Sequence, residues 1–374
     1  MSPRIKTAFL VVLWSGTVSV FAQKRVELLK DNVVPGAKWQ KALPESLGYS
    51  SKKLDVLRQW VSTQDTASML VVVQGRIIFS YGDVTHPSKI ASARKSVLGM
   101  LYGKYVQNRT IDLDKTVKQL GLDDKQPFLP LEETATLRQL LAARSGVYLP
   151  TSSTGQRGYL PPRGSEAPGA HYLYSNWDFN AAGAAFEKLT GQSIYDALQQ
   201  DFVRPLGMQD YQPSKQVKES DPLTKWPEYV MRLSARDMAR LGLLMLNKGK
   251  WNGQQIIPAE WVQYSTTLVT PFQDINPSFL RNYGSPERWG YSGALWWVWD
   301  TPAYPGGIYT GPWQGAFTAQ GAGGTYITVF PAGDMLIVHQ VDIDKNAKDF
   351  VTPSSYTAMI SMVMNSFCGE DCVL

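Results

Sequence analysis

Histidine, cysteine and runs of like charge are all scarce in this sequence. The 374 residues include three histidines and two cysteines, and these do not form the clusters that hold a zinc ion. The formal net charge is +5, yet lysine and arginine are spread along the chain and form no basic tract. We therefore expect neither a metal nor a nucleic-acid partner.

Several chemical signatures are also missing. The chain has no His-Glu-x-x-His, no phosphate-binding Gly-x4-Gly-Lys and no Rossmann glycine pattern, so no metal or organic cofactor is indicated. A histidine-based serine hydrolase would need a Gly-x-Ser-x-Gly elbow, and the nearest stretch, residues 290–293, is followed by Ala294 instead of glycine. His339 lies in an apolar stretch and is predicted to be a core residue.

Both cysteines, Cys368 and Cys372, stand in the last seven residues. If the protein is exported, a short terminal disulfide can form between them. The sequence alone leaves two alternatives open, a terminal disulfide or two free thiols, and assigns no chemistry to either cysteine.

Long apolar runs are confined to the N-terminus. Arg4 and Lys6 precede an uncharged stretch, residues 7–22, which is typical of a secretory signal and short for a membrane span. We predict that residues 1–22 are a signal peptide and that the mature protein begins near Gln23; an uncleaved anchor is the alternative. The expected location is the bacterial periplasm or the medium, with no stable membrane span after cleavage.

The remaining chain has the composition of a globular protein, with 44% hydrophobic and 18% charged residues. Two apolar runs around Gln74-Gly75 predict a hairpin, and alternating or apolar segments near the C-terminal end predict further strands. The predicted helices cover residues 51–62, 92–107, 136–143, 180–190, 193–202, 234–248 and 354–367, and the later strands cover 294–299, 315–320, 325–330 and 335–341.

This order of elements predicts an α/β (α+β) fold. One antiparallel sheet would be built from both ends of the chain and flanked by helices. We expect an α/β subdomain from residues 23–110 and 235–374, and a mostly helical subdomain, residues 111–234, inserted in it.

The segment Ser92-Ala93-Arg94-Lys95 opens a helix with an apolar stripe. Serine is a weak nucleophile until a base takes its proton, and a lysine three residues later lies on the same helical face. The helix N-terminus offers backbone N–H groups to a developing oxyanion. Ser50 and Lys53 have the same spacing, but they lie in a polar segment, so the context favours Ser92 as nucleophile and Lys95 as base.

Two further segments carry candidate functional residues. Tyr174-Ser175-Asn176 follows a Gly/Pro-rich loop; a tyrosine near a lysine can move protons, and an amide can orient an acyl group. Residues 321–325, Gly-Ala-Gly-Gly-Thr, lie between two predicted strands, where glycine lets the backbone approach a ligand closely. Helix capping by Asn176 and a tight turn at the glycines are the simpler structural interpretations.

In this order, the three motifs resemble the serine β-lactamase and penicillin-binding superfamily, specifically its class C-like branch, which includes family VIII esterases and nylon-oligomer hydrolases. The resemblance extends to Thr136–Leu141, to Pro205-Leu206-Gly207-Met208 and to Ser234–Met238, and covers residues 40–367. It implies a β-lactamase/DD-peptidase-like fold, with an antiparallel sheet flanked by helices, an all-helical subdomain and a cleft between them.

The resemblance also implies roles for individual residues. Ser92 would form the acyl-enzyme, and Lys95 and Tyr174 would share the acid–base work. The predicted substrate-binding residues are Asn176, Gly323, Gly324 and Thr325, with the N–H groups of Ser92 and of Gly324 or Thr325 binding the oxyanion. No cofactor is implied.

One position departs from the family pattern. Where the third motif usually begins with a cation that binds the substrate carboxylate, this chain has Ala322. The sequence leaves open whether Arg157, Arg163, Arg281 or Arg288 replaces that cation.

The prediction is an exported serine hydrolase, an esterase or amidase acting on a small-molecule ester or amide. A β-lactamase, a D-amino-acid peptidase and a non-catalytic protein that binds cell-wall peptides are the alternatives.

Overall fold

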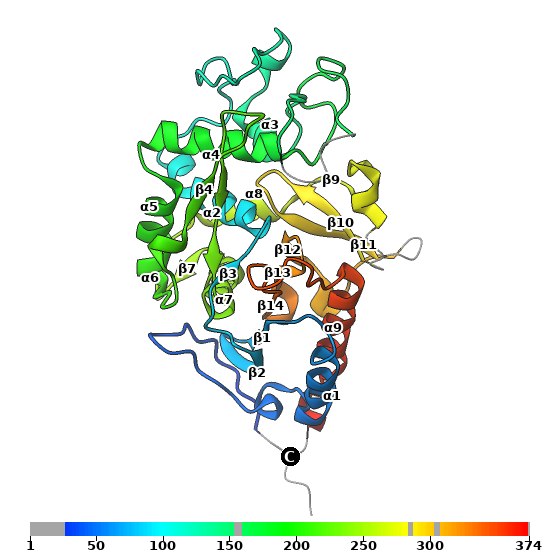
Figure 1. Ribbon diagram of the computed structural model, residues 1–374. Coiled ribbons are helices and arrows are strands. Elements are labelled where there is room, and N and C mark those ends of the chain that lie inside the picture. The colour runs from blue at the N-terminus through cyan, green and yellow to red at the C-terminus, as the bar shows by residue number, and fades with distance from the viewer. Residues whose placement is uncertain (1–26, 153–158, 283–286, 303–306, 373–374) are drawn as a thin grey trace, which may run out of the picture.

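The computed structural model describes residues 27–152, 159–282, 287–302 and 307–372. Its main element is an eight-stranded antiparallel sheet with the order β2-β1-β14-β13-β12-β11-β10-β9 (Figure 1). The strands are β1 (Ser68–Val73), β2 (Arg76–Gly82), β9 (Leu268–Thr270), β10 (Glu287–Ser292), β11 (Trp297–Pro302), β12 (Phe317–Gly321), β13 (Thr325–Phe330) and β14 (Met335–Gln340). Because β1 pairs with β14, both ends of the chain build one sheet, as predicted.

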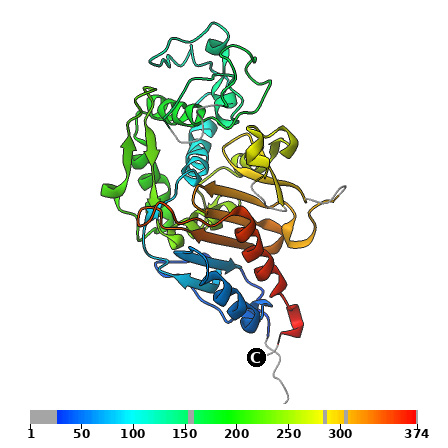
Figure 2. The same cartoon turned by 45° about the vertical axis from the view of Figure 1, so that its right-hand side comes forward.

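Helices cover both faces of the central strands. Successive residues of a strand point to opposite faces. On one face, Tyr326 of β13 stacks on Tyr356 of α9 (Pro353–Asn365), with ring centroids 3.9 Å apart. On the other, Ile327 lies against α7 (Ala235–Leu246), so close to Gly242 that an added Cβ would stand 2.9 Å from it. α1 (Ser51–Val61) packs against α9 (Figure 2).

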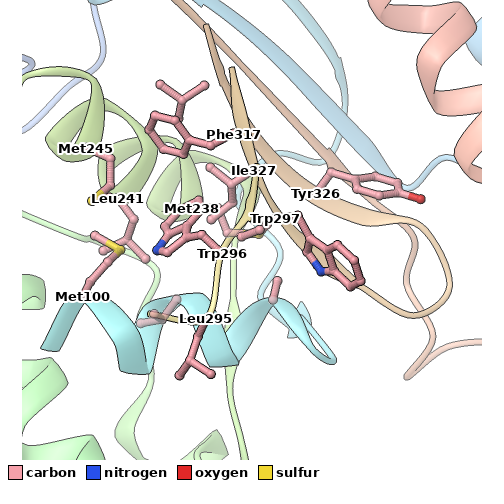
Figure 3. Close-up of a cluster of buried hydrophobic side chains, with 14 of the residues drawn as sticks. Met100, Met238, Leu241, Met245, Leu295, Trp296, Trp297, Phe317, Tyr326 and Ile327 are labelled. Carbon is pink, nitrogen blue, oxygen red and sulfur yellow. The ribbon is translucent and has the colours of Figure 1, made fainter. Parts of the chain in front are cut away.

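A buried helix, α2 (Ala93–Gln107), joins the sheet to the middle of the chain. Met100 of α2 meets Met238 and Leu241 of α7, together with Trp296 and Phe317, in one apolar cluster (Figure 3). Gly99 permits this packing, because a Cβ there would stand 2.4 Å from the carbonyl oxygen of Ala294. The second turn of α2 therefore packs directly on the turn between β10 and β11.

The regular secondary structure of the middle block is mainly helical, with some extended structure, and long loops join its elements. It contains α3 (Leu137–Leu141), α4 (Asn176–Thr190), α5 (Ile194–Leu198) and α6 (Arg204–Leu206). It also contains a two-stranded ribbon of β4 (Val217–Glu219) and β5 (Glu228–Val230), and β6 (Arg232–Leu233) pairs with β3 (Ser88–Lys89). The block is therefore not all-helical, and the residue bounds proposed for the two subdomains stay a prediction.

Five helices and strands that follow α7 were not indicated by the sequence: α8 (Ala259–Thr266), the strands β7 (Lys250–Trp251) and β8 (Gln254–Gln255), and the strands β9 and β10 of the main sheet. α8 packs on α2, and a short hairpin joins β7 to β8. Strand β11 begins at Trp297, three residues later than predicted, because Ser292–Leu295 form a turn in which Leu295 has a φ of 69°. By contrast, β13 has the predicted bounds.

The two cysteines form a disulfide, Cys368–Cys372, at the end of α9, which settles the alternative left open by the sequence. Within the described part of the chain, no helix is long and apolar enough to cross a membrane. The predicted signal peptide, residues 1–22, lies outside the described residues.

Candidate active site

Ser92 occupies the N-cap position of α2. Its side chain makes no capping hydrogen bond to the helix backbone, which is the usual role of a serine at this position. The preceding residue, Ala91, has a φ of 45°, in the left-handed region that non-glycine residues rarely adopt. The backbone thus turns sharply into the helix and leaves the Ser92 hydroxyl for other partners.

The Lys95 amine is the centre of a hydrogen-bonded cluster. It lies 3.0 Å from Ser92 Oγ, 2.7 Å from the Tyr174 hydroxyl and 2.6 Å from Asn176 Oδ1. The residue is only 2% exposed. Removing an amine from water disfavours its charged form, so burial lowers the pKa of Lys95 well below its usual value. The neighbouring Arg94 lowers this pKa further, and Glu228 opposes the effect.

Tyr174 is held by aromatic neighbours and by its backbone. Its ring stacks on Trp297 of β11 with centroids 5.7 Å apart, and its N–H donates to the carbonyl of Asn276 at 2.8 Å. Phe179 of α4 contacts the Tyr174 ring edge-on and also lies 4.4 Å below the Lys95 amine. The tyrosine hydroxyl therefore has a fixed position beside the lysine, as a proton carrier requires.

Asn176 is the first residue of α4, which begins four residues earlier than the sequence indicates. Its side-chain oxygen accepts the hydrogen bond from Lys95, and the side chain also lines a cleft. The structure thus brings together Ser92, Lys95, Tyr174 and Asn176, four of the seven residues that the sequence singles out.

The cleft beside these residues has a volume of about 580 Å³. Ser92, Tyr174 and Asn176 form one part of its wall, and Trp297, Gln320 and Ala322 form another. Three carboxylates also line it, from Glu219, Asp221 and Glu228. A small organic substrate fits a cavity of this size.

Gly323, Gly324 and Thr325 do not line this cleft. They form the far end of the β12–β13 hairpin, where the Gly324 carbonyl accepts a 2.5 Å hydrogen bond from His339 Nδ1. A Cβ on Gly324, whose φ is 111°, would meet the Val351 carbonyl oxygen at 2.8 Å. These positions argue against direct substrate contact by the three residues and favour a structural role in the hairpin.

Two residues before Gly323, the motif does make a close backbone approach, although to another part of the chain and not to a ligand. A Cβ on Gly321 would stand 2.3 Å from the carbonyl oxygen of Ile90, in the segment that leads to Ser92. Ala322, the next residue, is exposed and lines the cleft. The five-residue motif was singled out from the sequence, but spacing alone did not show that Gly321 packs on the Ile90 segment and that Ala322 faces the cleft.

None of the arginines considered as a replacement cation lines the cleft where the chain is described. Arg163 binds Glu132, and Arg281 donates to the Gln273 carbonyl. Arg288 lies over Phe272, and Arg157 falls outside the described residues. A lysine that the sequence did not suggest, Lys89, does line the cleft, with its amine 3.5 Å from Glu219.

The other serine and histidine candidates are structural. Ser292 is fully buried, and its hydroxyl accepts hydrogen bonds from the N–H groups of Ala294 and Trp296, both at 3.1 Å. His339 is buried as predicted; its ring nitrogens contact Gly324 O and Thr66 Oγ1, and burial lowers its pKa to about 4.

An antiparallel sheet flanked by helices, with Ser-x-x-Lys at the start of a buried helix, defines the class of serine β-lactamases and penicillin-binding proteins. The Beta-lactamase family profile matches residues 57–356. The chain belongs to the β-lactamase family, and the family and fold together support a serine hydrolase of this superfamily.

Solved structures share the fold at low identity. A putative 6-aminohexanoate-dimer hydrolase from Bacillus anthracis has a TM-score of 0.60 and 19% identity, with 91% of this chain and 89% of that chain covered. A penicillin-binding protein homolog from Caulobacter crescentus has a TM-score of 0.56 and 14% identity, with 79% and 93% covered.

Relatives by sequence are distant. An uncharacterised protein of Alkalihalophilus pseudofirmus is 25% identical over 264 residues, which is 67% of this chain and 71% of that protein. Protein flp of Staphylococcus aureus (strain COL) is 26% identical over 168 residues, 38% of this chain and 33% of flp.

Proposed function

We propose that the protein is an exported serine hydrolase that cleaves an ester or amide bond through an acyl-enzyme on Ser92. The observation that carries the proposal is the buried Lys95 amine, which contacts Ser92 Oγ at 3.0 Å and the Tyr174 hydroxyl at 2.7 Å. A lysine with a lowered pKa is neutral, and so able to accept a proton, at a pH where an exposed lysine is charged.

In the proposed mechanism, Lys95 and Tyr174 together take the proton of Ser92 as Oγ bonds to the substrate carbonyl carbon. The tetrahedral intermediate collapses with cleavage of the bond to the leaving group, which receives that proton through Tyr174. A water molecule then attacks the acyl-enzyme, and its proton returns to Ser92 by the same route. Asn176 would orient the acyl group.

The developing oxyanion needs two hydrogen-bond donors. The Ser92 N–H at the start of α2 is one proposed donor. From the family resemblance, the second donor was expected to be the N–H of Gly324 or Thr325. Because Ala322 of the same hairpin lines the cleft, its N–H is the better candidate.

The lining of the cleft favours substrates without a carboxylate. Ala322 provides no cation, Lys89 is paired with Glu219, and Asp221 and Glu228 add negative charge. Like charges placed close together in a cleft repel each other, so an anionic substrate would bind weakly. These features favour an esterase or amidase over a β-lactamase or a D-amino-acid peptidase.

Export rests on two observations. Residues 1–22 have the pattern of a signal peptide, and the Cys368–Cys372 disulfide is of the kind that persists in an oxidising compartment. The proposed location is the periplasm or the medium.

The test is a substrate panel assayed with the purified mature protein and with Ser92→Ala. The panel contains short-chain p-nitrophenyl esters, nitrocefin and a D-Ala-D-Ala peptide. We expect ester turnover that disappears in Ser92→Ala, with nitrocefin barely hydrolysed. Rapid nitrocefin turnover would favour the β-lactamase alternative, and ester turnover that persists in Ser92→Ala would overturn the proposal.

A further inference from the structure

Arg94, which directly precedes Lys95 in α2, is buried although it carries a charge. The residue is 2% exposed. Its Nε lies 3.4 Å from Glu228 Oε1, and its Nη2 donates to Asn180 Oδ1 at 3.2 Å. The guanidinium also lies over the ring of Tyr229, 4.1 Å from the centroid. A buried arginine is stable only with such partners.

These contacts connect three elements of the site. Arg94 belongs to the first turn of α2, Glu228 and Tyr229 belong to β5, and Asn180 lies one turn after Asn176 on α4. The same first turn of α2 reaches α4 a second time, through the bond from Lys95 to Asn176. The two links join the first turn of α2 to the start of α4 and so restrict the position of Lys95 relative to α4.

The pair also carries charge close to the Lys95 amine. The positive charge of Arg94 lowers the pKa of Lys95, and the negative charge of Glu228 raises it. Glu228 lines the cleft and its side chain is 28% exposed, whereas Arg94 does not reach the cleft lining. The other titratable groups around Lys95 and this pair are Lys89, Tyr174, Tyr195, Glu219 and Tyr229.

We propose that Arg94 and Glu228 are a positioning pair that anchors the first turn of α2, and with it Lys95, to β5 and α4. The consequence for catalysis rests on the proposed function, since it matters only if Lys95 accepts the proton of Ser92. Neither residue is expected to contact the reacting atoms.

The two charges must act in opposite directions. Removing the negative charge of Glu228 destabilises protonated Lys95, so its titration midpoint falls and the neutral amine exists at lower pH. Removing the positive charge of Arg94 stabilises protonated Lys95, so its midpoint rises. A merely structural role would lower activity in both variants without opposite shifts.

The direct test is an NMR titration of lysine labelled with ¹³C at Cε, with the Lys95 signal assigned by its loss in Lys95→Met. We expect Glu228→Gln, which keeps a hydrogen-bond acceptor for Arg94, to lower the Lys95 midpoint by about 0.5 to 1 pH unit. Arg94→Gln should raise it by a similar amount. Glu219→Gln removes another cleft carboxylate, which is paired with Lys89, and is the matched control expected to leave the midpoint in place.

The readout does not need turnover, so it separates this inference from the proposed function. A Lys95 midpoint that stays fixed in both variants, or that moves in the same direction in Glu228→Gln and Arg94→Gln, would overturn the proposed role of the pair even if the enzyme is active. Opposite shifts in a protein without Ser92-dependent hydrolysis would support the pair and reject the proposed function. Loss of the near-ultraviolet circular dichroism in Arg94→Gln would mean that this variant does not fold. Glu228→Gln then tests the proposal alone, and a fixed Lys95 midpoint in that variant contradicts it.

Kinetics then separate position from charge. The acid limb of the kcat/KM–pH profile should move to lower pH in Glu228→Gln, in line with the NMR midpoint. Arg94→Lys keeps the charge but loses the planar guanidinium fork. We therefore expect kcat to fall by about tenfold or more, with the acid limb unmoved, because mispositioning alone lowers the rate without changing the charge near Lys95. An unchanged kcat in Arg94→Lys would show that the anchoring contacts are dispensable.

Discussion

The chain contains two Ser-x-x-Lys turns, Ser50–Lys53 and Ser92–Lys95, each at the start of a helix. At α1, the Ser50 hydroxyl caps the helix by accepting from the Lys53 N–H at 3.4 Å, and the exposed Lys53 amine donates to the Asn365 carbonyl at 2.8 Å. At α2, the serine hydroxyl makes no cap bond and lies 3.0 Å from the lysine amine. The same spacing thus gives a helix cap in one place and a candidate nucleophile in the other.

The difference lies in the surroundings of the lysine. Lys53 is exposed, so its amine stays in contact with water. Lys95 is 2% exposed and has an aromatic ring, a tyrosine hydroxyl and an amide oxygen as neighbours. The long-range packing of α2 buries Lys95, and this burial favours the neutral amine that can accept a proton from Ser92.

The largest expected effect separates the two lysines. Lys95→Met should lower kcat/KM for a p-nitrophenyl ester by about 10² to 10⁴-fold, because the proton acceptor of Ser92 is lost. Lys53→Met, the matched control, should leave the rate within about twofold, since an exposed lysine contributes little. Equal losses in the two variants, measured by steady-state kinetics, would break the comparison.

A smaller effect is expected on stability. Ser50→Ala removes the cap of α1 and should lower the free energy of unfolding by about 1 kcal/mol. Ser92→Ala removes no cap bond, so its unfolding free energy should change less. Urea denaturation of both variants checks this; a cap-sized loss in Ser92→Ala together with none in Ser50→Ala would contradict the assigned roles.

Much of the fold was predictable from local pattern. The β1–β2 hairpin and strand β13 carry apolar runs bounded by glycine or proline, and both formed as expected. The short strands β4 and β9 carry few residues and little apolar pattern, so their pairing depends on tertiary contacts. The early start of α4 was also missed, because the Ser175–Phe179 segment has no apolar period of its own.

The site was predictable to a similar extent. Ser92, Lys95, Tyr174 and Asn176 stand in recognisable motifs, and the structure brings them together. The Arg94–Glu228 contact joins residues 134 positions apart, and no local pattern indicates such a pair. The cleft position of Ala322, in place of Gly323–Thr325, depends on how the β12–β13 hairpin meets the Ile90 segment, which spacing cannot show.

The most direct test of the central claim is to treat the mature protein with a fluorophosphonate and to map the adduct by peptide mass spectrometry. A single phosphonylated serine at Ser92, absent from the Ser92→Ala variant and much slower to form in Lys95→Met, is the predicted result. An adduct at Ser50 or Ser292, or labelling that is undiminished in Ser92→Ala, would contradict it.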